Sequence, residues 1–427
     1  MRILLLTQYY PPEMGAAQNR LFDLVRRLAN AGHVMTVLTA LPNYPKGTFF
    51  EGFQRRFLMD EREDGVRIIR TWLYVTKSKT FLRRMLNFTS FSALSLFVGA
   101  VKVKRQDFVI VESPPLFLGV SGFLISRLKR AKLVFNVSDL WPESAVALKV
   151  LRNRLLIQIA IRLEEFLYKK AQLITGQTEG IVANIRARCS GKPIAFIPNG
   201  VDVERFVPSA QIAEARPGIR TALGFNEHFI VGYAGLHGLA QGLETVLDTA
   251  RLLSEFPQIL VCFVGDGPER ARLKKLAEEA ATSNVRFIPA QPASRMAEVL
   301  SALDVVLVPL KRLSLFTGAL PSKMFEAMGA GVPVIVAIDG EARAVIEKSR
   351  GGIYVEPENP HRMAEAILQL YRDSALKKSL GENGRRYVVS HYSRSEAAKK
   401  FEQLLFLTLP PRGTDPWPLL NRRPNNG

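Results

Sequence analysis

The 427-residue chain has few cysteines and few histidines, and this scarcity excludes several kinds of protein. Its cysteines are Cys189 and Cys262, and its histidines number 5. A disulfide framework is therefore not expected, and a reducing cytosol is the natural compartment. The sequence also lacks a CxxC pair or a cluster of histidines and cysteines, which argues against a structural zinc site.

Long apolar runs are also scarce, and we expect none to cross a membrane. Residues 1–7 (MRILLLT) are too short a run for a signal peptide and predict a first buried strand. Residues 85–101 are flanked by Arg83, Arg84 and Lys102, but at ~1.5 Å per residue such a helix falls short of a roughly 30 Å hydrocarbon core. Interfacial attachment to a membrane and a helix buried in a domain both remain open for this run.

Acidic residues are fewer than basic ones, and the imbalance is uneven along the chain. The net charge is +19, from 58 lysines and arginines and 39 aspartates and glutamates. Residues 1–205 hold 31 of the basic and 16 of the acidic residues, a surplus of 15. We expect this half to face an anionic partner, such as a membrane leaflet, a lipid-linked phosphate or nucleic acid. The alternative is a surface that is charged only for solubility.

Short apolar runs and helical periodicity alternate along the whole chain, which is typical of an α/β fold. At this length, a hydrophobic content of 47% is enough for two domains, each with its own core. Two tandem α/β halves predict a deep cleft between them. We expect domains at 1–205 and 206–390, a last helix at 391–409 and a disordered tail at 410–427.

Residues 320–336 (LPSKMFEAMGAGVPVIV) combine a helix start, a helix and a buried strand. The backbone N–H groups and the positive dipole end of such a helix could hold a phosphate close to residues 318–320. Lys323 and Glu326 lie on one helix face, where the lysine could neutralise a diphosphate and the glutamate could bind a sugar hydroxyl pair. These residues suit a sugar nucleotide, although a solvated Lys/Glu pair on an ordinary helix remains open.

Two further loops have small residues at the ends of predicted strands. Residues 235–242 (GLHGLAQG) could cradle phosphates with backbone donors, and Arg312 is a further phosphate candidate. Residues 265–269 (GDGPE) could touch a base or ribose, but they do not form a GxGxxG fingerprint, which weakens a dehydrogenase assignment. For both loops the alternative remains open that the glycines only allow a tight turn of the backbone and bind no ligand.

Several of these motifs resemble those of glycosyltransferase family 4, whose members are retaining enzymes of the GT-B fold. The resemblance is carried by PSKxxExMxxGxPVI at 321–335, PPxxG at 11–15, DLWPE at 139–143 and PNGVD at 198–202. It covers nearly the whole chain before the tail, and DLWPE is similar to the subgroup of O-antigen and capsule N-acetylfucosamine transferases. The chain departs from the commoner family pattern where that pattern has a glutamate, an arginine and a lysine, at Gly318, Leu236 and Gln241 respectively.

The acceptor side is expected in the first domain. The small residues Gly15 and Ala16 could let the PPxxG loop approach the acceptor or the diphosphate. Ser138 and Asp139 follow a predicted strand, and Asp139 could orient or deprotonate an acceptor hydroxyl, although a turn or helix-cap aspartate remains open. Residues 41–79 form an irregular stretch that we also expect near the acceptor.

The resemblance implies two Rossmann-like domains facing across a cleft, with the last helix crossing back to the first domain. It also implies a retaining enzyme that needs no metal and no cofactor. The expected donor is a UDP-linked N-acetylated deoxyhexose. The expected acceptor is a polyprenyl-diphosphate-linked saccharide of O-antigen, capsule or exopolysaccharide synthesis, on the cytoplasmic face of the cell membrane. Candidate catalytic residues are Asp139, Lys323 and Glu326, candidate acceptor residues are Gly15, Ala16 and Ser138, and candidate donor-binding residues are Gly235, His237, Gln241, Gly265, Gly267, Arg312, Gly318, Ala319, Leu320 and Ser322.

Two alternatives belong to other classes of protein. A non-catalytic sugar-nucleotide-binding or assembly partner is suggested by Gly318, Leu236 and Gln241, which stand where the commoner family pattern has charged side chains. A nucleic-acid-binding protein is suggested only by the pI of about 10.0, and the chain lacks a motif of interleaved aromatic and basic residues. We therefore expect no nucleic-acid partner.

Overall fold

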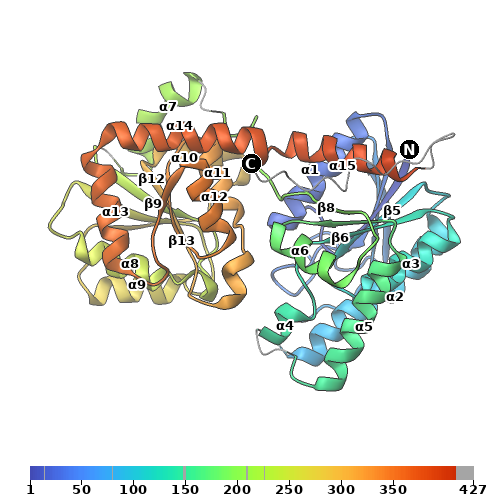
Figure 1. The fold of residues 1–427 in the computed structure, drawn as a ribbon. Helices are drawn as coiled ribbons and strands as arrows, with labels where there is room; N and C mark the ends of the chain where they lie inside the picture. Colours follow the sequence, from blue (N-terminus) through green and yellow to red (C-terminus); the bar gives the residue numbers. More distant parts are fainter. Residues whose placement is uncertain (14, 79, 148–150, 208–209, 226, 410–427) are drawn as a thin grey trace. The chain divides into compact units, whose positions relative to one another are not determined.

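The computed structural model describes residues 1–409 except residues 14, 79, 148–150, 208–209 and 226. The predicted disordered tail at 410–427 lies outside the described residues. The chain divides into two compact units, one formed by residues 1–199 together with helix α15 (Arg394–Thr408) and the other by residues 200–393 (Figure 1). Each unit contains its own sheet and its own buried core.

The first unit is built on an eight-stranded sheet in the order β3-β4-β2-β1-β5-β6-β7-β8, in which only β3 runs antiparallel. Most of its strands are continuous apolar runs, as expected for strands covered on both faces. The strands are β1 (Arg2–Leu6), β2 (Val34–Ala40), β3 (Leu58–Glu63), β4 (Val66–Thr71), β5 (Phe108–Ser113), β6 (Lys132–Val137), β7 (Leu173–Gly176) and β8 (Ile194–Phe196).

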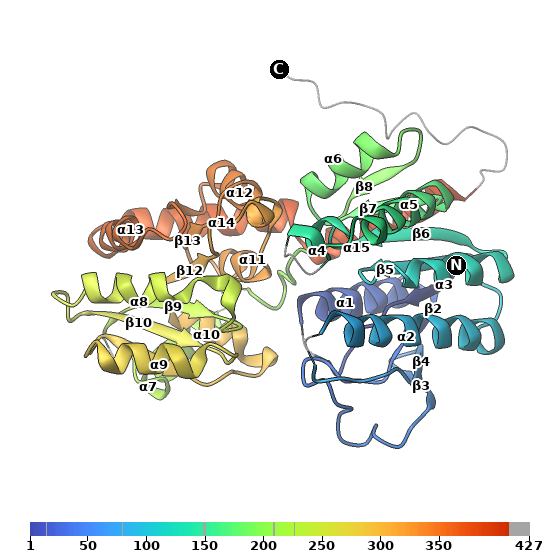
Figure 2. The ribbon, with the colours of Figure 1, turned by 90° about the horizontal axis from the view of Figure 1, so that it is seen from below.

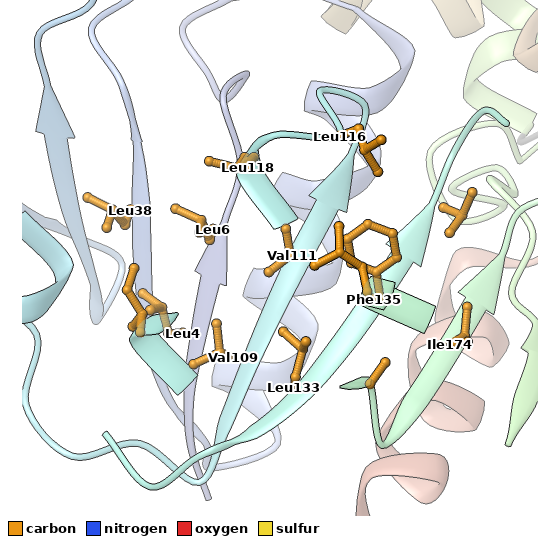
Figure 3. Close-up of a cluster of buried hydrophobic side chains, with 14 of the residues drawn as sticks. Leu4, Leu6, Leu38, Val109, Val111, Leu116, Leu118, Leu133, Phe135 and Ile174 are labelled. Atoms are coloured by element: carbon orange, nitrogen blue, oxygen red, sulfur yellow. The ribbon is translucent and has the colours of Figure 1, made fainter. Parts of the chain in front are cut away.

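Helices cover both faces of this sheet. One face packs on side chains of α1 and α15, including Leu21, Val25 and Phe401. The other face packs on α2, α3, α5 and α6 through a cluster that contains Leu6, Val111 and the residues drawn in Figure 3. The helices are α1 (Ala16–Asn30), α2 (Phe81–Lys102), α3 (Leu118–Leu128), α4 (Glu143–Ala147), α5 (Arg154–Lys170), α6 (Glu179–Arg188) and α15.

The strand order reverses between β1 and β5. From β1 the chain proceeds to β2 on one side, and from β5 it proceeds to β6, β7 and β8 on the other. Loops that leave the carboxyl ends of two such strands diverge and leave a crevice, where open α/β sheets bind their ligands. The PPxxG loop after β1 and the proline-rich turn after β5 both lie at this point.

The prediction of an irregular stretch at 41–79 is wrong in part, because that stretch contains the β3–β4 hairpin at one edge of the first sheet (Figure 2). β3 (LMDERE) is too polar to be recognised as a strand from hydrophobicity. It pairs with β4 through cross-strand ion pairs such as Arg67 with Asp60 at 2.6 Å. The turn between the strands is Asp64-Gly65, both with positive φ, and Asp-Gly is a preferred pair for a two-residue hairpin turn.

Helix α2 is longer than the predicted apolar run. It spans 22 residues, so at ~1.5 Å per residue it reaches the thickness of a hydrocarbon core, and the expectation that it is too short is wrong. Among the described residues, α2 is the one helix long and apolar enough to cross a membrane, which by itself is weak support for a span. Phe91, Ser95 and Val98 are buried against the rest of the unit, as in a domain helix.

The second unit is built on a six-stranded parallel sheet in the order β11-β10-β9-β12-β13-β14. Its strand order reverses between β9 and β12. The strands are β9 (Phe229–Ala234), β10 (Ile259–Val264), β11 (Val285–Ile288), β12 (Val305–Pro309), β13 (Val334–Ala337) and β14 (Gly352–Tyr354).

The helices of the second unit include α7, which the sequence analysis did not predict. Helices α8, α9 and α13 contribute to one core cluster with the sheet. Residues 200–205 belong to this unit, where the Val201 N–H donates to the Tyr392 carbonyl at 2.8 Å. The helices are α7 (Ala210–Ala222), α8 (Leu243–Leu252), α9 (Arg270–Glu279), α10 (Met296–Ala302), α11 (Ser322–Gly329), α12 (Glu341–Ser349), α13 (Pro360–Arg372) and α14 (Ser374–His391), with short 3-10 turns at Leu239–Gln241, Ala293–Arg295 and Ser314–Gly318.

Candidate functional site

Three loops of the second unit meet at the carboxyl edge of its sheet. The His237 N–H donates to the Asp266 carbonyl at 2.9 Å, which ties the glycine-rich loop after β9 to the loop after β10. The Lys311 N–H donates to the Ala240 carbonyl at 2.9 Å, which ties the same loop to the segment after β12. These loops flank the β9/β12 reversal, the place where such a sheet binds its ligand.

Glycine is sterically required at two positions in these loops. A Cβ at Gly235 would lie 3.0 Å from the Lys323 ammonium nitrogen, and the φ of Gly235 is 140°. A Cβ at Gly265 would lie 2.0 Å from the Gly235 carbonyl oxygen. The loops therefore approach one another as closely as backbone permits, and they leave main-chain groups near Lys323.

Lys323, in the first turn of α11, is held by a buried tyrosine. Its ammonium donates to the Tyr233 hydroxyl at 2.6 Å, and that hydroxyl donates to the Leu236 carbonyl at 2.6 Å. Burial lowers the pKa of Lys323 to about 7, against the raising effect of the Glu326 carboxylate one turn along the helix. The arrangement places between α11 and the glycine-rich loop an amine that can gain or lose its proton near neutral pH.

Several buried polar atoms of the glycine-rich loop and of the start of α9 have no hydrogen-bond partner among the described residues. They are both ring nitrogens of His237, Oε1 of Gln241 and Nε of Arg270. Because buried polar groups are almost always paired, this cluster is one that a polar ligand would complete. Burial, with the charges of Arg270 and Lys323, lowers the pKa of His237 to about 4, so the imidazole is neutral at neutral pH.

The remaining predicted donor residues lie around the start of α11, except Arg312 and Gly267. Gly318, Ala319, Leu320 and Ser322 lead into the helix, and a Cβ at Gly318 would lie 3.9 Å from the Glu341 carboxylate oxygen. The Arg312 guanidinium donates instead to the Pro357 carbonyl at 3.1 Å, so it is engaged away from Lys323. Gly267 shapes the second loop, since its Cβ would lie 2.4 Å from the His237 carbonyl oxygen.

In the first unit, Glu13 of the PPxxG loop is a buried carboxylate that the sequence analysis did not single out. It accepts the backbone N–H groups of Asn43 at 2.7 Å and Tyr44 at 2.8 Å, and so ties this loop to the segment after β2. Burial raises its pKa to about 7, opposed by these hydrogen bonds and by Arg70. The loop ends at Gly15, and Ala16 begins α1.

The pKa of Glu13 predicts a pH-dependent difference between wild type and Glu13→Gln. A carboxyl whose pKa rises from 4.5 to about 7 on folding stabilises the fold below pH 4.5 and loses that contribution as the pH rises through 7. The stability of Glu13→Gln relative to wild type should therefore increase by about 2–3 kcal/mol over this interval. Urea unfolding from pH 4.5 to 8 measures the difference, and parallel curves for the two proteins would contradict it.

The predicted acceptor residues Ser138 and Asp139 have different surroundings. The Ser138 hydroxyl donates to Glu112 and accepts from Arg20 at 3.1 Å, so it belongs to a buried network. Arg20 and Glu112 form an ion pair at 2.6 Å inside this network. Asp139 is exposed to solvent but has apolar neighbours that raise its pKa, against hydrogen bonds from Ser144 and the Leu140 N–H.

Asp139 lines a cavity of about 230 Å³ at the β1/β5 reversal of the first sheet. Tyr9 enters it from the loop after β1, and the Pro114-Pro115 turn enters it from the end of β5. Arg84, from the first turn of α2, and Trp141, after β6, also line the cavity. The structure thus places one candidate site at the strand reversal of each unit.

Sequence reasoning missed Tyr233, Glu13, Arg20 and Glu112. Tyr233 looks like an ordinary strand residue, and nothing local shows that its hydroxyl meets Lys323. Glu13 lies in the recognised PPxxG motif, which could have drawn attention to it. Among residues 1–409 as described, no group of three or more His, Cys, Asp or Glu side chains is placed to hold a metal ion.

Comparisons with known proteins connect both halves of the chain to one activity. Residues 15–200 match the model of a glycosyl transferase 4-like domain, and residues 216–387 match the model of glycosyl transferases group 1. The chain is 27% identical over 413 residues to WcaI of Escherichia coli, a glycosyl transferase assigned to colanic acid biosynthesis, covering 94% of this chain and 98% of that protein.

Solved structures show the same fold at low identity. Sucrose-phosphate synthase from Thermosynechococcus elongatus superposes with a TM-score of 0.69 at 20% identity, over 95% of this chain and 98% of that one. HepE of Anabaena in complex with UDP-glucose superposes with a TM-score of 0.69 at 17% identity, over 95% of this chain and 99% of that one. The predicted two-domain GT-B fold is confirmed, and the chain belongs to the GT-B glycosyltransferases, with a 4-like domain followed by a group 1 domain.

Proposed function

We propose that the chain is a retaining, metal-independent glycosyltransferase that moves a sugar from a nucleotide donor to a lipid-diphosphate-linked saccharide. The observation that carries this proposal is the cluster around Lys323 in the second unit. There a half-buried lysine, two glycine-rich loops and unpaired polar atoms of His237, Gln241 and Arg270 converge at one sheet edge.

The chemistry of this cluster fits a nucleoside diphosphate sugar. Lys323 and the N–H groups at the start of α11 attract the diphosphate, because both present positive charge to it. Glu326, one turn along the same helix face, accepts the two hydroxyls of the ribose. The exposed Gly318 leaves room for the donor sugar, and the Glu341 carboxylate beside it supplies a hydrogen-bond acceptor for a sugar hydroxyl.

The relatives support a UDP-linked donor and a cell-surface product. HepE, which shares the fold, was solved with UDP-glucose. WcaI, which matches over nearly its whole length, is a glycosyl transferase assigned to colanic acid biosynthesis. We infer a UDP-linked N-acetylated deoxyhexose as donor, and a role in O-antigen, capsule or exopolysaccharide synthesis on the cytoplasmic face of the membrane.

In the proposed reaction an acceptor hydroxyl oxygen bonds to the anomeric carbon as the bond from that carbon to the diphosphate breaks. The hydroxyl proton passes to the departing phosphate oxygen on the same face of the sugar, so the configuration is retained. Lys323 and the helix N–H groups stabilise the negative charge that develops on the leaving diphosphate. Asp139 orients the acceptor by accepting a hydrogen bond.

Peripheral attachment to an anionic membrane is supported by the outer face of the first unit. Helices α2, α3 and α5 share one core cluster, with Phe123 of α3 against Phe166 of α5 at 5.3 Å (Figure 1). The two acidic residues of these helices are Glu164, which is buried, and Glu165. Their exposed large apolar residues are Leu82, Leu86, Phe97, Val101, Leu124, Leu128, Leu155, Leu156, Ile159 and Phe166, and their exposed basic residues are Arg83, Arg84, Lys102, Arg127, Arg154, Arg162, Lys169 and Lys170.

Donor turnover tests the function directly. The full chain is incubated with UDP-, GDP- and dTDP-sugars and with a membrane extract as acceptor, beside Glu326→Ala and the matched surface variant Glu347→Ala. We expect one donor to be consumed, with the KM for that donor raised at least tenfold in Glu326→Ala and unchanged in Glu347→Ala. Binding of a nucleotide sugar without turnover under any condition would instead identify a non-catalytic binding partner.

A further inference from the structure

The cavity of the first unit has the position of a ligand site that the donor does not use. It lies at the β1/β5 reversal, outside the carboxyl ends of the strands, where ligands bind in open α/β sheets. Its volume of about 230 Å³ is below the roughly 300–1,000 Å³ of sites that enclose a whole drug-sized molecule. It therefore suits one segment of a longer ligand.

The walls of this cavity are mostly apolar. They are formed by Phe88 of α2, Leu116 and Phe117 after β5, and Trp141 after β6. The rings of Phe117 and Trp141 are in edge-to-face contact, with 5.9 Å between their centroids. A saccharide segment would need more hydrogen-bonding groups than such walls offer. A hydrocarbon segment buries apolar surface there at about 25 cal/mol per Å².

Two charged groups mark the open part of the lining. Arg84 is exposed, and no hydrogen bond or ion pair of its guanidinium is found among the described residues. Asp139 lies across the lining, held by Ser144 and the Leu140 N–H. The apolar walls can bind a hydrocarbon chain, and the guanidinium beside them can pair with a phosphate at the end of that chain. The Asp139 carboxylate, which also lies at the opening of the cavity, can accept a hydrogen bond from a hydroxyl beyond that phosphate.

An apolar stripe runs along the exposed face of α2, the helix that also lines this cavity. Leu82 and Leu86 are exposed on the turns that also carry Arg84, and Phe97 and Val101 continue the same face toward the other end of the helix. The spacing of these four residues follows the helical period, so they form one stripe. Arg84, Met85 and Phe88, which line the cavity, lie on another side of α2, so the stripe is a surface separate from the cavity.

We propose that this cavity binds the isoprenoid-phosphate end of the lipid-linked acceptor. The first isoprene units pack against Phe88, Leu116 and Trp141, and Arg84 pairs with the phosphate. The saccharide then begins beside Asp139. The inference rests on the proposed function, because it names the part of the acceptor that this enzyme would recognise.

Binding of soluble isoprenoid phosphates by the full chain tests the proposal. Farnesyl diphosphate, farnesol and inorganic pyrophosphate are titrated by calorimetry, with the variants Arg84→Gln, Phe88→Asp and Trp141→Phe. We expect farnesyl diphosphate to bind at least tenfold more tightly than either of its parts. Arg84→Gln should weaken it about tenfold while leaving farnesol unchanged, and Phe88→Asp should weaken both.

A matched control separates the cavity from the outer face of the same helix. Phe97→Ser lies on the exposed stripe of α2, so it should lower cosedimentation with phosphatidylglycerol vesicles and leave farnesyl diphosphate binding unchanged. Equal farnesyl diphosphate affinity in wild type, Arg84→Gln and Phe88→Asp would overturn the proposal. Loss of binding in Phe97→Ser to the same extent as in Phe88→Asp would also overturn it, because the site would then be the outer face.

Failure of the proposed function would look different. If no nucleotide sugar is turned over but farnesyl diphosphate binds and responds to Arg84→Gln, the cavity is an isoprenoid-phosphate site in a protein of another activity. If a donor is turned over while Arg84→Gln and Phe88→Asp leave the KM for the lipid acceptor unchanged, the proposed glycosyltransferase function is supported and the assignment of the cavity is wrong.

Discussion

Lys323→Ala is expected to lower kcat/KM for sugar transfer by about two to three orders of magnitude, the effect of removing one preorganised charge-stabilising group. Lys323 is the cation that the structure places beside the glycine-rich loop, and its ammonium is already oriented by the Tyr233 hydroxyl at 2.6 Å. Steady-state kinetics with the donor identified by turnover measures the loss. A reduction of less than threefold would show that the leaving diphosphate is stabilised elsewhere.

Tyr233→Phe is the matched control for this prediction. It keeps the lysine and the ring over which the ammonium lies at 3.8 Å, and it removes only the hydroxyl. Because one hydrogen bond is lost and the charge is kept, the expected reduction is about tenfold. A loss as large as that of Lys323→Ala would mean that the tyrosine does more than orient the lysine.

The same lysine should make donor binding depend on pH. With its pKa lowered to about 7, Lys323 loses its proton as the pH rises above neutrality, and a bound diphosphate restores the proton. Nucleotide affinity should therefore be level below pH 7 and fall by up to tenfold per pH unit above it. Lys323→Arg stays charged throughout this range and should abolish the slope in calorimetric titrations.

Arg20→Ala is expected to destabilise the first unit by about 3–5 kcal/mol, the largest stability effect we predict. Arg20 and Glu112 form a buried ion pair at 2.6 Å, with 6% and 5% of their side chains exposed. Removal of the guanidinium leaves the Glu112 carboxylate buried with only neutral donors, Asn136 and Ser138. Thermal or urea unfolding of the full chain, followed through the transition of the first unit, measures the change.

Arg27→Ala serves as the control on the same helix. Arg27 pairs with Asp23 one turn away, but about a fifth of each side chain is exposed, so this variant should lose about 1 kcal/mol or less. The double variant Arg20→Met/Glu112→Leu should recover much of the stability lost in Arg20→Ala, since it leaves no buried charge. Equal losses in Arg20→Ala and Arg27→Ala would contradict the importance of the buried pair.

Most of the fold could be predicted because its signals are local. The strands β1, β9 and β10 are continuous apolar runs, and the helices between them carry one apolar face each. The hairpin β3–β4 was missed because an edge strand is polar on much of its surface. Helix α7 was missed as well, and it contains Pro217, a residue that local propensity places outside helices.

The candidate site was predictable only in part. Lys323 and Glu326 were recognised because the helical period puts residues three apart on one face. Tyr233 could not be recognised, since 90 residues separate it from Lys323 and only the sheet brings them together. The cavity of the first unit combines α2 with loops after β1, β5 and β6, and no local pattern indicates that these segments meet.

The sequence by itself determined that the chain forms two α/β halves and that Lys323 and Glu326 share a helix face. These properties follow from periodicity and turn residues, which act over a few positions along the chain. Only the tertiary structure decided the ionisation of buried groups in each unit, with Glu13 of the first unit and Lys323 of the second titrating near pH 7 and His237 neutral there. Desolvation sets these pKa values, and it depends on side chains and backbone that arrive from distant parts of the sequence.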